Sequence, residues 1–74
     1  MTKLPRDIKG REMITLLIKL GFKKVGGRGS HIRFKHADGR TTQVAVHPKP
    51  IPQGTLRAIL RQIKMNIEDF IKLR

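Results

Sequence analysis

Residues 30–46 read SHIRFKHADGRTTQVAV, and this stretch decides the fold. Polar and apolar side chains alternate along residues 30–36 and again along residues 41–46. An alternation with a period of two is typical of strands that bury one face. The Asp38-Gly39 dipeptide between the two segments favours a tight hairpin. The stretch therefore predicts two antiparallel strands.

The alternation assigns the side chains of these strands to opposite faces of a sheet. The apolar face is expected to hold Ser30, Ile32, Phe34, Thr42, Val44 and Val46. The other face is expected to hold His31, Arg33 and Lys35. The sequence thus predicts a sheet with one packed face and one basic face open to solvent.

Upstream of this stretch we expect a third strand and a helix. Residues 22–25 form the short strand, and the glycine-rich residues 26–29 form a flexible turn after it. A helix is predicted over residues 9–20, because four apolar residues recur at helical spacing. These are Met13, Leu16, Leu17 and Leu20. Asp7 is the expected N-cap of this helix and Gly21 its expected C′ residue.

Downstream, Pro48, Pro50 and Pro52 predict an extended connection, since proline fixes φ and restricts the residue before it. A second helix is predicted over residues 53–64. Its apolar stripe consists of Leu56, Ile59, Leu60 and Ile63, and its basic stripe of Arg57, Arg61 and Lys64. Asn66, with Asp69 three residues on, is the expected N-cap of a short terminal helix.

The predicted order is α-β-β-β-α plus the short terminal helix, which is an α+β fold with a three-stranded antiparallel sheet. Both main helices are expected on the apolar face of the sheet, where they share one core. Double-stranded-RNA-binding domains have this order of elements, so by analogy the predicted fold is dsRBD-like. With 74 residues, the chain is expected to form a single domain over residues 1–74.

The chain is strongly basic. It has 17 Lys and Arg residues against 5 Asp and Glu residues, which gives a formal net charge of +12. From Lys19 to Lys64 there are eleven basic residues and a single carboxylate, Asp38. An excess of this size indicates a polyanionic partner, either a nucleic acid, an anionic membrane or an acidic protein. Binding to a membrane is the weakest of these three hypotheses, because the apolar faces of the helices are needed for the core.

The composition also argues against several classes of protein. The absence of cysteine excludes disulfides and thiolate metal sites. The apolar runs are too short to cross a membrane, and no secretory signal is visible, so we expect a cytoplasmic protein. Five scattered carboxylates do not predict a two-metal nuclease site, and we expect no metal or other cofactor. All three phenylalanines fit core positions, which leaves no stacking platform for bases.

His31 is the candidate catalytic residue. Near neutral pH an imidazole can take a proton from a ribose 2′-hydroxyl or give one to a leaving oxygen. Taken alone, an exposed strand histidine is more often an ordinary surface residue, and His36 and His47 are weaker candidates still. The expected RNA-binding residues around His31 are Arg28, Gly29, Ser30, Arg33 and Lys35, with Arg57 and Arg61 on the second helix.

The motifs together resemble those of the HicA toxins of HicA–HicB toxin–antitoxin systems. The resemblance covers nearly the whole chain. It is carried by Leu20-Gly21-Phe22, Gly29-Ser30-His31, Phe34, Asp38-Gly39-Arg40, Val44-x-Val46-His47, the segment at residues 54–60, and Glu68-Asp69-Phe70. The chain departs from the family pattern at Ile32, Ala45 and Lys64, where many members have histidine, proline and glycine.

The resemblance implies the toxin of a type II toxin–antitoxin system, with a dsRBD-like fold. It implies an endoribonuclease that cleaves mRNA, whose catalytic histidine is that of the Gly-Ser-His motif, His31. It also implies a HicB-like antitoxin that neutralises the toxin. The alternative that the residues leave open is a non-catalytic RNA-binding module that uses the same fold and the same basic faces.

Overall fold

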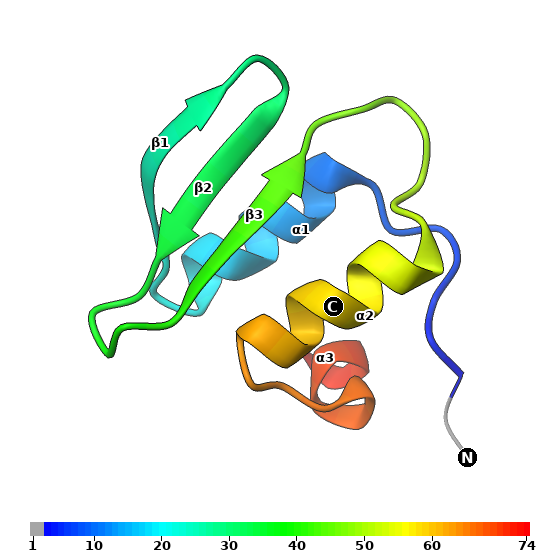
Figure 1. Cartoon of the computed structure of the whole chain (residues 1–74). Coiled ribbons are helices and arrows are strands. Elements are labelled where there is room, and N and C mark those ends of the chain that lie inside the picture. The colour runs from blue at the N-terminus through cyan, green and yellow to red at the C-terminus, as the bar shows by residue number, and fades with distance from the viewer. Residues whose placement is uncertain (1–2) are drawn as a thin grey trace.

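The computed structural model describes residues 3–74 and has the predicted order of elements (Figure 1). The elements are α1 (Gly10–Lys19), β1 (Lys23–Arg28), β2 (His31–Lys35), β3 (Thr41–Ala45), α2 (Gln53–Gln62) and α3 (Ile67–Leu73). The three strands form an antiparallel sheet in the order β1-β2-β3. The predicted α+β class and the predicted α-β-β-β-α layout are confirmed.

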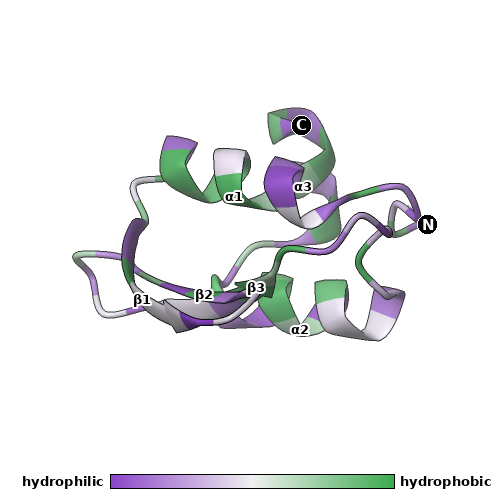
Figure 2. Cartoon of the chain, turned by 90° about the horizontal axis from the view of Figure 1, so that it is seen from above, coloured by the Kyte–Doolittle hydropathy of each residue, from purple (hydrophilic) through white to green (hydrophobic). Residues whose placement is uncertain are grey.

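The three helices do not all lie on the same side of the sheet. Figure 2 shows α1 and α3 on one side of the sheet, whereas α2 lies beside the β3 edge. The sequence predicted both main helices over one face of the sheet. In the structure α1 lies over that face, whereas α2 lies at the edge of the sheet, next to β3. A sheet of three strands is narrow, and α1 already covers its packed face. The apolar stripe of α2 therefore joins the same core from the β3 edge.

The core contains the apolar positions that the sequence pattern selected. Met13, Leu16 and Leu17 of α1 are buried, as is the whole predicted stripe of α2. All three phenylalanines are at most 2 % exposed. On β2, Phe34 is buried while His31, Arg33 and Lys35 are exposed, as the alternation predicts. The other face of the sheet, which carries these three polar residues, is open to solvent.

The first hairpin differs from the prediction. β1 continues through Arg28, and the turn to β2 consists of Gly29 and Ser30 alone. A β-bulge between Lys24 and Gly26 lets the glycine-rich segment pair with β2 as a strand. A Cβ atom on Gly27 would lie 2.6 Å from the backbone oxygen of His31, so this strand position requires glycine.

The helix ends differ in detail from the prediction. Asp7 is not the N-cap of α1, because that position is Lys9, which makes no side-chain capping bond. Asp7 instead pairs with Arg74 at 2.9 Å. Gly21 has the predicted left-handed backbone, with φ of 95°. At the start of α3, the Asn66 side chain accepts a hydrogen bond from the Asp69 N–H at 2.8 Å, so the predicted cap is confirmed.

Within residues 3–74, no helix has the length and apolar character that a membrane crossing requires.

Candidate active site

His31 is the first residue of β2 and directly follows the Gly29-Ser30 turn. Gly29 has φ of 62° at the first central position of this two-residue loop, a conformation that glycine adopts without steric cost. His31 lies opposite Arg28 on one side and opposite Ala45 of β3 on the other. Since paired residues of antiparallel strands share a face, the hairpin places Arg28 and His31 side by side.

A side chain of β3 holds the imidazole of His31. Nε2 of Gln43 lies 2.7 Å from Nδ1 of His31, which is a hydrogen bond between neighbouring strands. A glutamine amide has a donor end and an acceptor end, so by rotating it can bond Nδ1 with or without a proton. Gln43 is therefore able to hold the ring in place through a change of protonation. The sequence analysis gave Gln43 no role.

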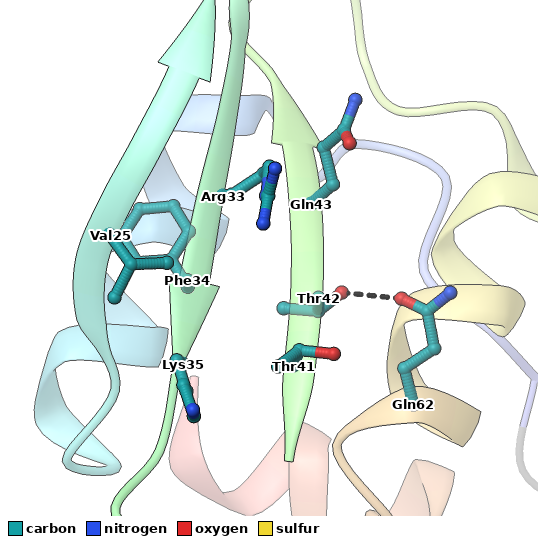
Figure 3. A pocket seen from close by; sticks show the side chains of 8 residues that line it. All are labelled: Val25, Arg33, Phe34, Lys35, Thr41, Thr42, Gln43 and Gln62. Atoms are coloured by element: carbon teal, nitrogen blue, oxygen red, sulfur yellow. Dashed lines mark hydrogen bonds between the residues drawn. The ribbon is translucent and has the colours of Figure 1, made fainter. Parts of the chain in front are cut away.

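The predicted basic residues of β1 and β2 lie on the same open face. Arg28, Arg33 and Gln43 line one hollow together with His31. A second hollow of about 410 Å³ lies next to it over the centre of the sheet and includes Arg33 and Lys35 (Figure 3). Arg28, Arg33 and Lys35 are all exposed, so their charges are available to a partner. The sequence prediction of a basic face around His31 is in accord with this geometry.

The structure does not bring Arg57 and Arg61 to His31. Both are exposed on α2, but neither lines the two hollows that include His31. The residues of α2 that approach His31 are Thr55 and Ile59. Arg57 and Arg61 therefore lie on a separate basic surface.

The three histidines have different surroundings. His36 has a structural role, because its Nε2 contacts the Leu20 carbonyl at 3.1 Å and its Nδ1 accepts a bond from the Asp38 N–H. Its ring also meets the edge of Phe22, with centroids 5.1 Å apart. These contacts tie the β2–β3 turn to the end of α1. His47, by contrast, is exposed and lies beside His31.

The Asp38-Gly39-Arg40 turn is stabilised by its own polar contacts. The Asp38 carboxylate accepts bonds from the backbone N–H of Arg40 at 3.0 Å and from its Nε at 2.8 Å. The backbone bond, followed by the guanidinium, lowers the pKa of Asp38. The single carboxylate in the basic middle of the chain is thus paired within its own turn, and this turn follows the opposite end of β2 from His31.

A hollow of about 400 Å³ opens between the end of β3 and the start of α2. It is mostly apolar, with His31 and His47 at one side and Lys49 among its lining residues. The remaining lining residues are Ala45, Pro50, Ile51, Pro52, Thr55 and Ile59. The sequence analysis described the proline-rich segment only as a connection. Its contribution to this hollow depends on the packing of α2, which no local pattern reveals.

Comparison with known protein families gives a match over most of the chain. Residues 10–65 match the family described as the HicA toxin of bacterial toxin–antitoxin systems. The chain belongs to the HicA toxin family. A HicA toxin is one half of a toxin–antitoxin pair, so the family implies an antitoxin partner. The matched segment runs from α1 to the residues just after α2, and it includes His31, Gln43 and His47. A search of curated proteins found no match to the chain.

Proposed function

We propose that this HicA toxin is an endoribonuclease that cleaves mRNA without a metal ion, with His31 as its catalytic residue. The observation that carries the proposal is the contact between Gln43 and the Nδ1 atom of His31, on an exposed face that also presents Arg28 and Arg33. An imidazole bonded at Nδ1 directs its other nitrogen, Nε2, toward the substrate.

The proposed reaction uses the RNA's own nucleophile. His31 removes the proton of a ribose 2′-hydroxyl, and the 2′ oxygen forms a bond to the adjacent phosphorus. The bond from phosphorus to the 5′ oxygen of the next nucleotide breaks, and that oxygen gains a proton. The products are a 2′,3′-cyclic phosphate and a 5′-hydroxyl. Each of these steps is either a proton transfer or a substitution at phosphorus. Imidazole and guanidinium side chains can assist both kinds of step.

The cationic side chains supply the electrostatic part of catalysis. Negative charge grows on the phosphate oxygens as phosphorus becomes five-coordinate, and preorganised guanidinium groups stabilise it. Arg28 and Arg33 line one hollow with His31. Lys35 lies further along β2 and is proposed to hold a flanking phosphate. Gly29 and Ser30 are proposed to shape the turn against which the RNA backbone rests.

We also propose that a HicB-like antitoxin neutralises the toxin in the cytoplasm by covering the His31 face. A net charge of +12 favours an acidic partner. Opposite charges speed the encounter of two proteins, and added salt slows it because screening acts within about 8–10 Å at physiological ionic strength. Charge reversal at Arg33 is therefore expected to weaken the complex.

A non-catalytic RNA-binding module is the second candidate. The basic open face supports it equally well, because phosphate contacts alone give sequence-independent binding to RNA. The two candidates differ in whether His31 is needed. A binding module requires the cations, whereas the nuclease also requires the imidazole and its Gln43 contact.

Product analysis tests the proposal. RNA is incubated with the purified toxin in excess EDTA, beside an RNA of the same sequence in which every sugar is 2′-deoxy. The nuclease is expected to cleave only the RNA, and its products are expected to carry 2′,3′-cyclic phosphate and 5′-hydroxyl ends. Cleavage of the deoxy oligonucleotide would contradict the 2′-hydroxyl mechanism, and activity that requires Mg²⁺ would contradict metal independence.

A further inference from the structure

His31 and His47 form a pair of exposed imidazoles at one end of the open face. Their ring centroids lie 6.4 Å apart and their planes are nearly perpendicular, at 85°. Both rings line the hollow between β3 and α2. We propose that His47 is the second catalytic residue of the reaction, the general acid that complements His31 as general base. This inference rests on the proposed ribonuclease function.

The backbone holds His47 at this place. The Val46 N–H donates to the Ser30 carbonyl at 2.8 Å, so the residue before His47 is bonded to the residue before His31. The far end of the connection is fixed as well, because the Ile51 N–H donates to the Ile8 carbonyl at 2.7 Å. Three prolines restrict the segment after His47. The position of His47 therefore follows from backbone bonds, which makes its nearness to His31 a property of the fold.

Helix α1 packs closely against the backbone just before His47. Gly10, the first residue of α1, lies so close to Ala45 and Val46 that a Cβ atom there would collide with their backbone. The close approach of α1 to the end of β3 supports the segment from beneath. His47 is thus backed by α1 and by the β3 end, and its side chain is left exposed beside His31.

The spacing suits a phosphodiester between the two rings. A bridging phosphate forms one charge-assisted hydrogen bond of about 2.8 Å to each side, so its two partners must stand several ångströms apart. The centroids of the two rings lie 6.4 Å apart and both rings line one hollow, so a phosphate bound in that hollow can contact both. The two hollows that include His31 have Arg28, Arg33 and Lys49 as their charged lining residues. A further hollow beside His47 has Lys9 and Arg11, so all the charged residues that line the three hollows are cations.

A second imidazole completes the proton balance of the reaction. The 2′-hydroxyl proton passes to His31 as the 2′ oxygen bonds to phosphorus. The bond from phosphorus to the 5′ oxygen then breaks, and that oxygen takes its proton from protonated His47. The cycle ends with His31 protonated and His47 neutral, and proton exchange with water restores both. A base must be neutral and an acid must be protonated, so the rate is expected to rise and then fall with increasing pH.

The first experiment measures cleavage by wild type and His47→Gln across pH. The variant is expected to lose about 10²–10⁴-fold in rate and to lose the alkaline fall of the profile. His36→Gln serves as the matched control: it removes a structural histidine and is expected to lower thermal stability while keeping both limbs. If wild type cleaves RNA and His47→Gln keeps its rate and both limbs, the role of His47 is overturned and that of His31 stands. If wild type cleaves no RNA, both proposals fall.

The second experiment separates the acid from the base. In an RNA whose scissile 5′ oxygen is replaced by sulfur, the leaving thiolate departs without a proton, because thiols are far more acidic than alcohols. His47→Gln is expected to regain a rate near that of wild type on this substrate, and His31→Ala is expected to stay slow. A sulfur substrate that rescues neither variant, or that rescues His31→Ala alone, would overturn the assignment of His47 as the acid.

Discussion

At the residue scale, the candidate site depends on a hydrogen bond between one glutamine and one histidine. Gln43 reaches Nδ1 of His31 from the neighbouring strand, at 2.7 Å. Neither residue is buried, so the contact is not required to satisfy a desolvated group. A contact of this kind orients the ring, and orientation of the general base is part of what fixes a catalytic rate.

Replacing Gln43 with glutamate is expected to change the pH dependence of cleavage. A carboxylate beside Nδ1 stabilises the protonated imidazole, and His31 acts as a base only when it is neutral. The acidic limb of the rate profile should therefore move to higher pH. Gln62→Glu is the matched control, since Gln62 bonds Thr42 at the β3 edge and does not contact His31. Equal profiles for Gln43→Glu and wild type would show that Gln43 does not act on the imidazole.

At the element scale, the end of α2 carries a local strain. Lys64 follows the last turn with φ of 56°, a left-handed conformation that glycine adopts without cost. Lys64→Gly is expected to stabilise the chain by about 1 kcal/mol, seen as a higher midpoint in urea unfolding. Lys72→Gly, inside α3, removes the same charge from a helical position and is expected to destabilise. A Lys64→Gly variant no more stable than wild type would contradict the strain.

The terminal helix is joined to the N-terminal half by Arg74. Its guanidinium contacts Asp7 at 2.9 Å and Glu12 of α1 at 2.7 Å. The hydrogen bond from Arg74 is the main cause of the lowered pKa of Asp7. A carboxyl whose pKa is lowered by folding adds stability above its unfolded pKa, and this contribution is lost as the pH falls through the lowered value.

Arg74→Gln should therefore be less thermostable than wild type at neutral pH. The difference in Tm is expected to begin to shrink below about pH 4, the ordinary pKa of an aspartate, and to shrink further as the pH falls through the lowered pKa of Asp7. Lys72→Gln removes a charge from the same helix without removing these contacts, and its Tm is expected to follow that of wild type. A constant difference between Arg74→Gln and wild type at every pH would assign the effect to packing.

The sequence predicted elements well where burial repeats along the chain. Alternation on β2 and β3 placed His31 and Phe34 on opposite faces, because each strand contacts the core on one side only. The first hairpin was misplaced, since a bulge and glycines with strand geometry leave no periodic signal. The nearness of His47 to His31 depends on a bond from Val46 to Ser30, a long-range pairing that local patterns do not contain.

At the scale of the whole molecule, one side of the sheet packs on the core and the other side is exposed and basic. α1 covers the packed side (Figure 1). The open side presents Arg33 and Lys35 (Figure 3), together with Arg28 and His31. A net charge of +12 attracts polyanions to the molecule as a whole. The open side is the place where that attraction coincides with a group able to carry out chemistry.

This division predicts which cations bind RNA. Affinity for an RNA with 2′-O-methyl sugars, which lacks the nucleophile, is measured as a function of salt concentration. Arg33→Ala is expected to weaken binding. It is also expected to reduce the magnitude of the slope of log affinity against log salt by about 1, which corresponds to the loss of one phosphate contact. Lys72→Ala, on α3, is expected to leave the slope unchanged. Equal slopes for Arg33→Ala and wild type would place the RNA on another surface.

The central claim is that His31 is the catalytic residue of this toxin. The most direct measurement is the rate of RNA cleavage by wild type and by His31→Ala, in excess EDTA and at one pH. Circular dichroism and the melting temperature verify that the variant is folded, as expected for an exposed position. Cleavage by wild type and a loss of about 10²–10⁴-fold in His31→Ala would support the account. A folded His31→Ala variant that cleaves RNA as fast as wild type would contradict it.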